Sequence, residues 1–508
     1  MRRALVLLAL SATACVATPP IVIGDAAPPV TAPPAQVAVR VLDYRGDPLA
    51  GAEVEITHAE GSETTVSDEN GLTYVTWDIR GLEIDATAPA HEPGSVSVAQ
   101  LPDTEEVEVR LTAKVLTGTV LGLGGTPLEG ATVTLGEESL MTGADGAFQF
   151  IAVEEGASIS VERAAYMVGS SEWDGGSPEV QLEPLVVRGV RAGGPDPRDP
   201  EKWAELLAIA EATEVNTMVV DIKDESGQVF YETQVPLGAE IAVYSTFDVA
   251  QVVEDVRSRG LYLVGRIVTF QDPIAARAMP EIAVFDTTTG QPYNRNGQWF
   301  LDPTDPAARQ YALDLAVEAC ELGFQEIQFD YIRYPDGFPD HARFDGGSSD
   351  EIRPEVIRSF LGEARGLLNP MGCAVSADIF GFITRTSGDG GIGQQLEMLS
   401  EVTDALSPMI YPSHYSTGWY GFDVPNDHPG PVVAGAIDDG LERIEGDVIL
   451  RPWIQDFFYT DEQVREQIEV ANERNVGWIL WNAVSNYSVG ALDPAGVTQA
   501  ATVDAVGG

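Results

Sequence analysis

Basic residues are scarce in this sequence of 508 residues. Lysine and arginine together number 29 against 79 aspartates and glutamates, which gives a formal net charge of −50. Such an acidic surface repels nucleic acids and other anionic polymers, so we expect no nucleic-acid partner. The charge favours neutral or cationic polymers as partners, although acidity that serves only solubility would give the same composition.

Histidine is rarer still, and its spacing argues against the common metal sites. None of the five histidines forms a pair at i, i+4 spacing, and His414 and His428 fall in an expected loop. This pattern disfavours a polysaccharide deacetylase or another metal hydrolase. Carboxylates are plentiful, but no spacing among them selects a metal ion, so we expect neither a metal nor another cofactor.

The sequence also lacks an apolar run long enough to span a bilayer. A short run at residues 4–10 follows two arginines and precedes small residues, which is the pattern of an export signal over residues 1–14. Residues 12–15, ATAC, resemble the lipobox of bacterial lipoproteins, which implies that Cys15 is lipidated and anchors the protein to a membrane. An ordinary secretory signal cut nearby is the alternative. We therefore expect the protein in the cell envelope, in the periplasm or on the outer surface.

Two similar segments follow a tether. Residues 15–36 are rich in proline, alanine and threonine, a composition that predicts an extended chain. VLDYRGDPLAGAEVEIT (41–57) then matches VLGLGGTPLEGATVTLG (120–136). Short alternating strands separated by turn residues predict two β-sandwiches, over residues 37–112 and 113–185. They resemble the carboxypeptidase-regulatory-like repeats of secreted bacterial proteins. Binding of carbohydrate or protein is one interpretation, but we favour a spacer because no aromatic cluster forms a sugar platform.

From residue 186 onward, apolar strand-like runs alternate with helical segments, which indicates a parallel α/β architecture. Eight strands are expected, at residues 186–192, 217–223, 262–269, 326–332, 374–380, 405–411, 448–454 and 477–482. Amphipathic helices are expected at residues 200–213, 249–258, 305–322, 354–368 and 461–474, and Asp305 and Thr460 stand at two of their starts. Eight strands in this length fit one (β/α)₈ TIM barrel over residues 186–508. A doubly wound sheet is less well supported, because no glycine-rich phosphate loop follows the first strand.

Besides Cys15, the sequence has only two cysteines, Cys320 and Cys373. Each lies in an expected barrel element, so we expect two buried thiols rather than a bridge. A disulfide stays open as the alternative if the compartment is oxidising. Neither spacing suggests a metal ligand.

Polar side chains gather where the expected barrel strands end. In EIQFDYIRYP, residues 326–335, alternation places Ile327 and Phe329 on one face and Asp330 on the other. A buried carboxylate needs compensation, and at the C-terminal end of a barrel strand its usual role is catalysis. Asp378 on the next strand is expected to face the barrel axis. The candidate substrate-binding residues at the other strand ends are Asp221, Lys223, Arg266, Arg333, Tyr411, His414, Tyr415, Trp453, Asp456 and Trp481.

Two carboxylates on adjacent strand ends suit glycosidic bond cleavage. One of Asp330 and Asp378 can stabilise or trap the anomeric centre while the other protonates the leaving oxygen. Aromatic side chains around them offer flat apolar surfaces for sugar rings. Structural roles are the alternative: Asp330 as an ion-pair partner of Arg266 or Lys223, Asp378 as a loop cap, and the tryptophans as packing at the barrel end.

Six segments stand out in this region: VVDIKDESG (219–227), GRIVTFQD (265–272), GFQEIQFDYIRYP (323–335), SADIFG (376–381), SPMIYPSHY (407–415) and RPWIQDF (451–457). They resemble a bacterial glycoside hydrolase (β/α)₈-barrel family related to the α-amylase and α-galactosidase-type hydrolases. The resemblance covers residues 186–490 and implies that Asp330 is the nucleophile and Asp378 the acid/base. Many relatives use glutamate for the second role, so the aspartate departs from their pattern.

The sequence thus predicts an exported, lipid-anchored glycoside hydrolase that cleaves a poly- or oligosaccharide with two carboxylates. Retention of configuration is the expected outcome, which requires carboxyl groups about 5 Å apart. The alternative is a non-catalytic barrel that binds a glycan or the cell envelope. The sugar, the linkage and the oligomeric state stay open.

Overall fold

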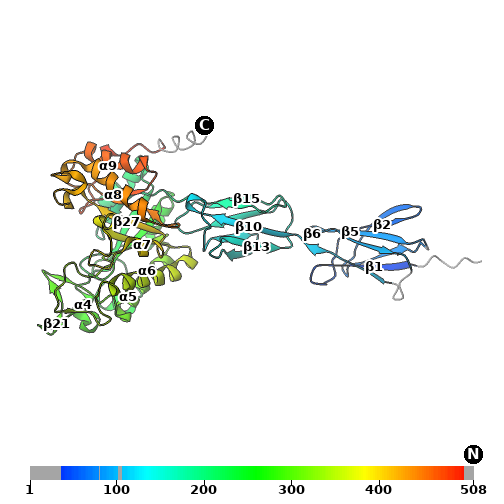
Figure 1. Cartoon of the computed structure of the whole chain (residues 1–508), viewed down its shortest axis with the longest axis horizontal. Coiled ribbons are helices and arrows are strands. Elements are labelled where there is room, and N and C mark those ends of the chain that lie inside the picture. Colours follow the sequence, from blue (N-terminus) through cyan, green and yellow to red (C-terminus); the bar gives the residue numbers. More distant parts are fainter. Residues whose placement is uncertain (1–35, 79, 101–105, 497–508) are drawn as a thin grey trace, which may run out of the picture. The chain divides into compact units, whose positions relative to one another are not determined.

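The computed structural model describes residues 36–78, 80–100 and 106–496 (Figure 1). The expected export signal, the lipidation site at Cys15 and the tether up to residue 35 lie outside the described residues. Among the described helices, none combines the length and the apolar character that a bilayer span requires. The chain divides into two compact units, residues 1–114 and 115–508.

Two sheets enclose the core of the first unit. The sheets have the orders β4-β1-β8 and β3-β2-β5-β7. Alternation explains the core: in β2 the side chains of Val54 and Ile56 are buried, and the glutamates beside them are exposed. The strands are β1 (Gln36–Leu42), β2 (Glu53–His58), β3 (Gly61–Val66), β4 (Leu72–Thr76), β5 (Leu82–Thr87), β7 (Gly94–Val98) and β8 (Glu106–Arg110).

The second unit begins with a similar set of strands. Their sheets have the orders β13-β10-β16 and β12-β11-β14-β15 and enclose a core of their own. The matching turns have a steric reason, because Gly71 and Gly146 both have positive φ, and a Cβ at either would lie within 2.5 Å of a backbone oxygen. The strands are β10 (Val115–Leu121), β11 (Thr132–Leu135), β12 (Glu138–Met141), β13 (Ala147–Ile151), β14 (Ser158–Glu162), β15 (Gly169–Glu172) and β16 (Glu179–Gln181).

The rest of the second unit is built on a parallel barrel of eight strands. Every neighbouring pair is parallel, and pairing of β17 with β30 and of β26 with β27 closes the ring. The seventh strand is formed by two short pieces, β28 and β29. The strands are β17 (Arg188–Ala192), β18 (Thr217–Lys223), β19 (Tyr262–Val268), β24 (Glu326–Asp330), β26 (Ala374–Phe380), β27 (Ala405–Ile410), β28 (Ile449–Leu450), β29 (Trp453–Gln455) and β30 (Trp478–Trp481). The expected (β/α)₈ architecture is confirmed.

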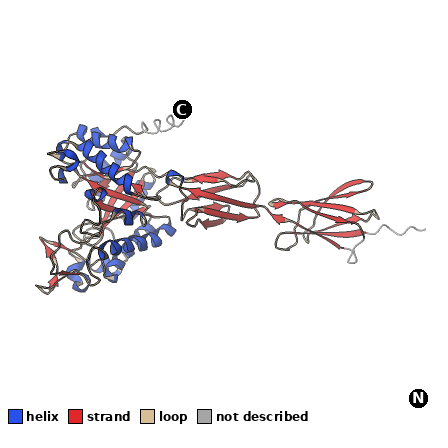
Figure 2. Ribbon diagram, in the orientation of Figure 1, coloured by secondary structure: helices blue, strands red, loops and turns tan. Residues whose placement is uncertain are grey.

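Helices cover the outside of this barrel (Figure 2). Two expected starts are confirmed: the Asp305 side chain accepts hydrogen bonds from Ala307 and Ala308, and Thr460 forms a capping box. The sequence analysis did not identify α8, which is interrupted by proline and glycine. The helices are α1 (Pro200–Ala212), α2 (Pro236–Ile241), α3 (Val249–Arg257), α4 (Ala275–Ala278), α5 (Pro306–Leu322), α6 (Ile352–Leu368), α7 (Leu396–Ser400), α8 (Pro429–Arg443) and α9 (Asp461–Glu473).

Cys320 and Cys373 form a disulfide, so the expectation of two free thiols is wrong. Cys320 lies in the last turn of α5, and Cys373 directly precedes β26. Because α5 leads into β24, and β24 pairs with β26, the two cysteines meet at the N-terminal ends of adjacent strands, with their Cα atoms 6.1 Å apart. Their proximity could not be predicted from the sequence because 53 positions separate them.

Candidate active site

A cavity of about 540 Å³ lies at the C-terminal ends of the barrel strands. Its lining comes mainly from strand ends and the loops that follow them, which is where barrels of this kind carry their active sites. Eight of the expected site residues line it: Arg266, Asp330, Arg333, Tyr411, His414, Tyr415, Trp453 and Trp481. The sequence analysis missed other lining residues, among them Glu225, Tyr331, Phe380, Phe382, Gln394 and Trp419.

Four expected site residues lie behind the cavity lining. Asp378 is buried beside Trp453, and Asp221 is buried between two arginines. The Nζ atom of Lys223 lies 3.0 Å from Asp272 and donates to the carbonyl oxygen of Val268 at 2.7 Å. Asp456 accepts hydrogen bonds from the backbone nitrogen and the hydroxyl of Ser488, at 2.9 and 2.7 Å. The structure therefore brings eight of the twelve expected site residues to the cavity surface.

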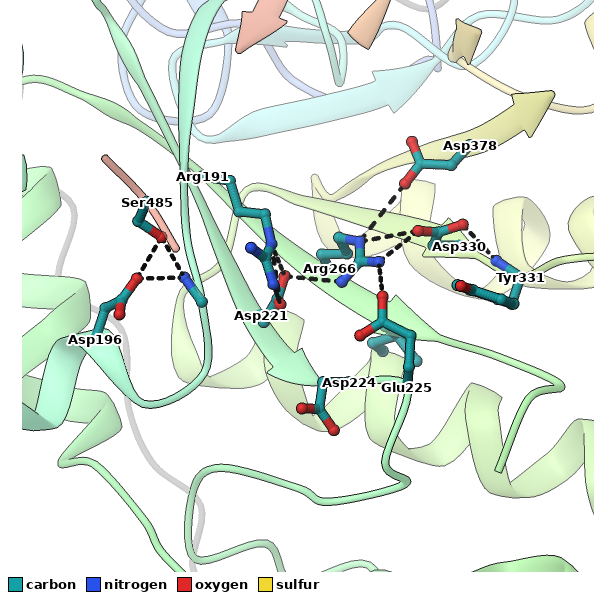
Figure 3. A network of polar contacts seen from close by, with 12 residues as sticks. Arg191, Asp196, Asp221, Asp224, Glu225, Arg266, Asp330, Tyr331, Asp378 and Ser485 are labelled. Carbon is teal, nitrogen blue, oxygen red and sulfur yellow. Dashed lines mark hydrogen bonds and ion pairs between the residues drawn. The ribbon is translucent and has the colours of Figure 1, made fainter. Parts of the chain in front are cut away.

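The fully buried guanidinium of Arg266 is the centre of the site (Figure 3). On one side its Nη1 atom donates to Asp221 at 3.0 Å, and its Nη2 atom donates to Glu225 at 2.6 Å. On the other side its Nε atom lies 3.1 Å from Asp330 and 3.8 Å from Asp378. Strand order explains the arrangement, because β19, which carries the arginine, lies between β18 and β24.

Asp221 connects a second arginine to this centre. Arg191 on β17 donates through Nε to both carboxylate oxygens of Asp221, at 3.1 and 3.0 Å. The guanidinium carbons of Arg191 and Arg266 lie 4.4 and 5.1 Å from the ring centre of Trp481, within the range of cation–π attraction. Asp221 and the two arginines thus fix one aromatic wall of the cavity from behind.

Glu225 is a second carboxylate at the cavity surface, beside Asp330. It follows β18 in the loop after Asp224, and the turn there brings its side chain back to Arg266. Burial alone would raise the pKa of Glu225, but the charge of Arg266 and the hydrogen bond from it lower this pKa to about 2. Glu225 is therefore ionised at any pH at which the protein is expected to work.

Asp330 and Asp378 occupy opposite environments. Asp330 accepts from Arg266 and, at 2.6 Å, from the backbone nitrogen of Tyr331, which are the partners of an ionised carboxylate. Asp378 accepts from Nε1 of Trp453 at 2.6 Å, but its Oδ2 atom has no hydrogen-bond partner among the described residues. Burial, reinforced by the negative charge of Asp330, raises the pKa of Asp378 well above its usual value. Asp330 thus accepts from a cation and a backbone amide, whereas its neighbour Asp378 is poised to carry a proton.

Backbone strain accompanies this pair. Tyr331, directly after Asp330, has a φ of 49°, a left-handed conformation that is unfavourable for a bulky residue. Strain of this kind concentrates at functional sites because the surrounding structure has to maintain it. Here it turns the backbone nitrogen of Tyr331 toward the carboxylate of Asp330.

Aromatic rings form much of the remaining wall. Trp453 and Trp481 pack edge to face with ring centres 5.4 Å apart, and Tyr411 lies 6.5 Å from Trp481. Tyr415 and Trp419 form a second edge contact at 5.3 Å. Burial lowers the pKa of His414 at this rim, which favours its neutral form. Such flat apolar surfaces with few polar groups are typical of sites that bind small organic rings.

Residues 192–487 match a protein family described as "Putative glycosyl hydrolase domain". The match covers more than half of the chain. The chain belongs to this family. The matched domain includes Arg266, Asp330, Asp378 and the aromatic wall. The match confirms the expected resemblance of the barrel to a glycoside hydrolase domain.

Solved structures with detectable similarity include a hypothetical protein from Ruminiclostridium thermocellum ATCC 27405, with 35% identity over 37% of this chain and 96% of that chain and a TM-score of 0.34. The spore cortex-lytic enzyme SleL of Bacillus cereus has 9% identity over 63% and 75% of the two chains and a TM-score of 0.38. The glycoside hydrolase domain of PelA from Pseudomonas aeruginosa has 14% identity over 59% and 96%, with a TM-score of 0.36. No curated protein matches the sequence.

Proposed function

We propose that the barrel hydrolyses the glycosidic bonds of a poly- or oligosaccharide, with Asp330 as nucleophile and Asp378 as acid and then base. The observation that carries this proposal is the pair itself. Two carboxyl groups approach one guanidinium, yet the first has the partners of an anion and the second has a raised pKa. In glycosidases, such a difference in environment between two neighbouring carboxyl groups distinguishes the acid from the nucleophile.

In the first step, an oxygen of Asp330 forms a bond to the anomeric carbon while the bond from that carbon to the leaving oxygen breaks. The proton of Asp378 passes to the leaving oxygen. In the second step, a water molecule attacks the anomeric carbon, its proton returns to Asp378, and the bond to Asp330 breaks. Both carboxyl groups approach the same Nε atom of Arg266, which favours the short separation of retaining enzymes over the wider one of inverting enzymes.

Asp378 lies directly behind two residues of the cavity lining, Arg266 and Trp453. Its proton therefore has a short path to the cavity, through a small movement of the side chain or through one water molecule. Glu225 adds a fixed negative charge at the cavity surface, which suits the positive charge that develops on the sugar in the transition state.

The proposal places this enzyme outside the cytoplasm, anchored to a membrane through Cys15. Support comes from the sequence of residues 1–15 and from the disulfide between Cys320 and Cys373, because such bridges persist in oxidising compartments. Residues 37–112 and 113–185 would then act as spacer domains between the lipid anchor and the catalytic domain at 186–508.

A non-catalytic glycan-binding barrel is the second candidate. The observation that favours it is the burial of Asp378, whose side chain is only 1% exposed. An aromatic cavity can hold a sugar without any proton donor at its surface. In this case the buried carboxyl group would serve only to position Trp453.

The test is release of reducing ends by the purified protein from a panel of neutral, cationic and anionic polysaccharides. Asp330→Asn should abolish release while leaving the circular dichroism spectrum unchanged, and Asp378→Asn should lower release by about 10²-fold or more. Asp438→Asn, a surface aspartate paired with Arg474, is the matched control and should keep full activity.

Undiminished release of reducing ends by Asp330→Asn would refute the assignment of Asp330 as the nucleophile. If no polymer is cleaved but one is retained in affinity electrophoresis, and truncation of Trp481 abolishes that retention, the binding barrel is the correct function. For a cleaved substrate, proton NMR of the first product anomer decides between retention and inversion.

A further inference from the structure

Buried basic side chains in the described part of the chain are almost all paired with a carboxylate. The paired ones are Arg163, Arg191, Lys223, Arg266, Arg353 and Arg451. The exception is Arg333, which is 7% exposed and forms no ion pair with any described residue. An uncompensated charge in a protein interior is strongly unfavourable, so this exception calls for an explanation.

Aromatic rings and one carbonyl group surround Arg333. The Nη1 atom donates to the backbone oxygen of Tyr334 at 3.1 Å. The guanidinium carbon lies 5.4, 5.0 and 4.9 Å from the ring centres of Phe300, Tyr331 and Phe380. Cation–π attraction offsets part of the lost hydration. It satisfies none of the four remaining N–H donors, and the side chain lines the cavity.

The acidic residues of the cavity that the structure describes attract this charge but form no ion pair with it. Glu225 and Asp330 both line the cavity, but both are hydrogen-bonded to Arg266. The cavity thus presents one guanidinium that is held in place by rings, keeps free donors and has no anion of its own. A guanidinium in this state matches a planar carboxylate, which can accept two parallel hydrogen bonds from it.

We propose that Arg333 binds a carboxylate of the substrate, so that the sugar taken into the cavity is a uronic acid residue. This inference rests on the proposed function for its reaction, but the binding of the anion can be tested without turnover. It departs from the expectation, drawn from the net charge, that the protein favours neutral or cationic polymers. The field of exposed charges is screened beyond about 8 Å at physiological ionic strength, whereas a contact inside a cavity is screened far less.

The experiment compares acidic oligosaccharides with their methyl esters, which keep the shape of the sugar and remove its charge. Oligogalacturonate, oligoglucuronate and oligomannuronate are titrated into the full protein by calorimetry, each beside its ester. We expect at least one acid to bind about tenfold more tightly than its ester. Arg333→Gln should abolish this preference, and Arg333→Lys should keep part of it because the charge remains without the planar fork.

Arg343→Gln is the matched control, because Arg343 also stacks on an aromatic ring, Phe285, but is exposed and lies near Asp345. It should leave the preference unchanged. Melting temperatures show whether each variant folds, and the comparison of acid with ester in the unmodified protein needs no variant.

Equal binding of acid and ester in every pair, or binding of none, overturns the inference. A protein that cleaves a neutral polysaccharide without preferring any acid is a hydrolase for which only the role of Arg333 is wrong. A protein that binds an acid through Arg333 but releases no reducing ends from any polymer keeps the binding site and loses the proposed reaction.

Discussion

Replacing Trp453 by phenylalanine should move the alkaline limb of the pH–rate profile to higher pH. The indole Nε1 atom of Trp453 donates to Asp378 at 2.6 Å, and this bond lowers the pKa of Asp378 against the larger opposing effect of burial. Phenylalanine keeps the aromatic contact with Trp481 but cannot donate. Without the donor, the ionised form of Asp378 is less stable, so the group keeps its proton to a higher pH.

The magnitude follows from the difference between two kinds of hydrogen bond. A bond to a charged group contributes a net ~1.5–3 kcal/mol, and a bond between neutral groups contributes ~0.5–1.5 kcal/mol. The difference of about 1 to 1.5 kcal/mol is the free energy by which the indole favours the ionised carboxylate. Since 1.36 kcal/mol corresponds to a factor of ten in acidity, we expect the limb to rise by roughly one pH unit.

The assay is kcat/KM for reducing-end release between pH 4 and 10, because this quantity reports the acid and base of the free enzyme. Trp478→Phe is the control: Trp478 is also fully buried and donates to Asn472 at 3.2 Å, but it lies outside the cavity lining. Its limb should stay in place. A limb that is unchanged or lower in Trp453→Phe would refute Asp378 as the proton donor, whatever the effect on rate.

Three further results are expected. Glu225→Gln removes a negative charge that is paired with Arg266. The positive charge of Arg266 then acts more strongly on Asp378 and should lower its pKa, so the same alkaline limb should move to lower pH, opposite to the effect of Trp453→Phe. Arg451→Met leaves a buried glutamate of β24 without its ion-pair partner and should reduce the free energy of unfolding in urea by ~3–5 kcal/mol. Burial opposes the charge of Asp404, but nearby arginines lower its pKa below the usual value. The ionised Asp404 therefore stabilises the folded protein above about pH 4, and this contribution is lost as the pH falls through the pKa of Asp404 in the folded state. Asp404→Asn should flatten that part of a plot of melting temperature against pH.

The barrel could be predicted because its strands are buried on both faces. The expected strands at 217–223 and 374–380 coincide with β18 and β26, since continuous apolar runs bounded by turns leave little freedom in their limits. Helix α8 was missed for the opposite reason. Its sequence, PGPVVAGAIDDGLER, contains two prolines and three glycines, and only packing against the barrel makes it helical.

The candidate site was predictable only as far as strand ends locate it. Asp330 and Asp378 were found because each interrupts an apolar strand at the end where barrels place their chemistry. Glu225 was missed because it lies in a loop, where no periodicity tells which way a side chain turns. In the sequence, Lys223 and Arg266 are both basic residues near the ends of expected barrel strands, so both were expected to bind substrate. A register shift between Asp221 and Lys223 accompanies the burial of the lysine away from the cavity, against Asp272.

The role of Asp221 shows why pairs of residues are not enough to explain this site. Around the proposed proton donor, Arg191 and Arg266 carry two positive charges, and Asp221, Glu225 and Asp330 offer three negative ones. If Asp221 were absent, only Glu225 and Asp330 would balance the two arginines, the site would lose its net negative charge, and the pKa of Asp378 would fall. By engaging both arginines, Asp221 leaves the site slightly negative without touching the cavity. A residue expected from the sequence to bind substrate therefore acts one layer deeper, where it maintains the protonation that the proposed chemistry requires.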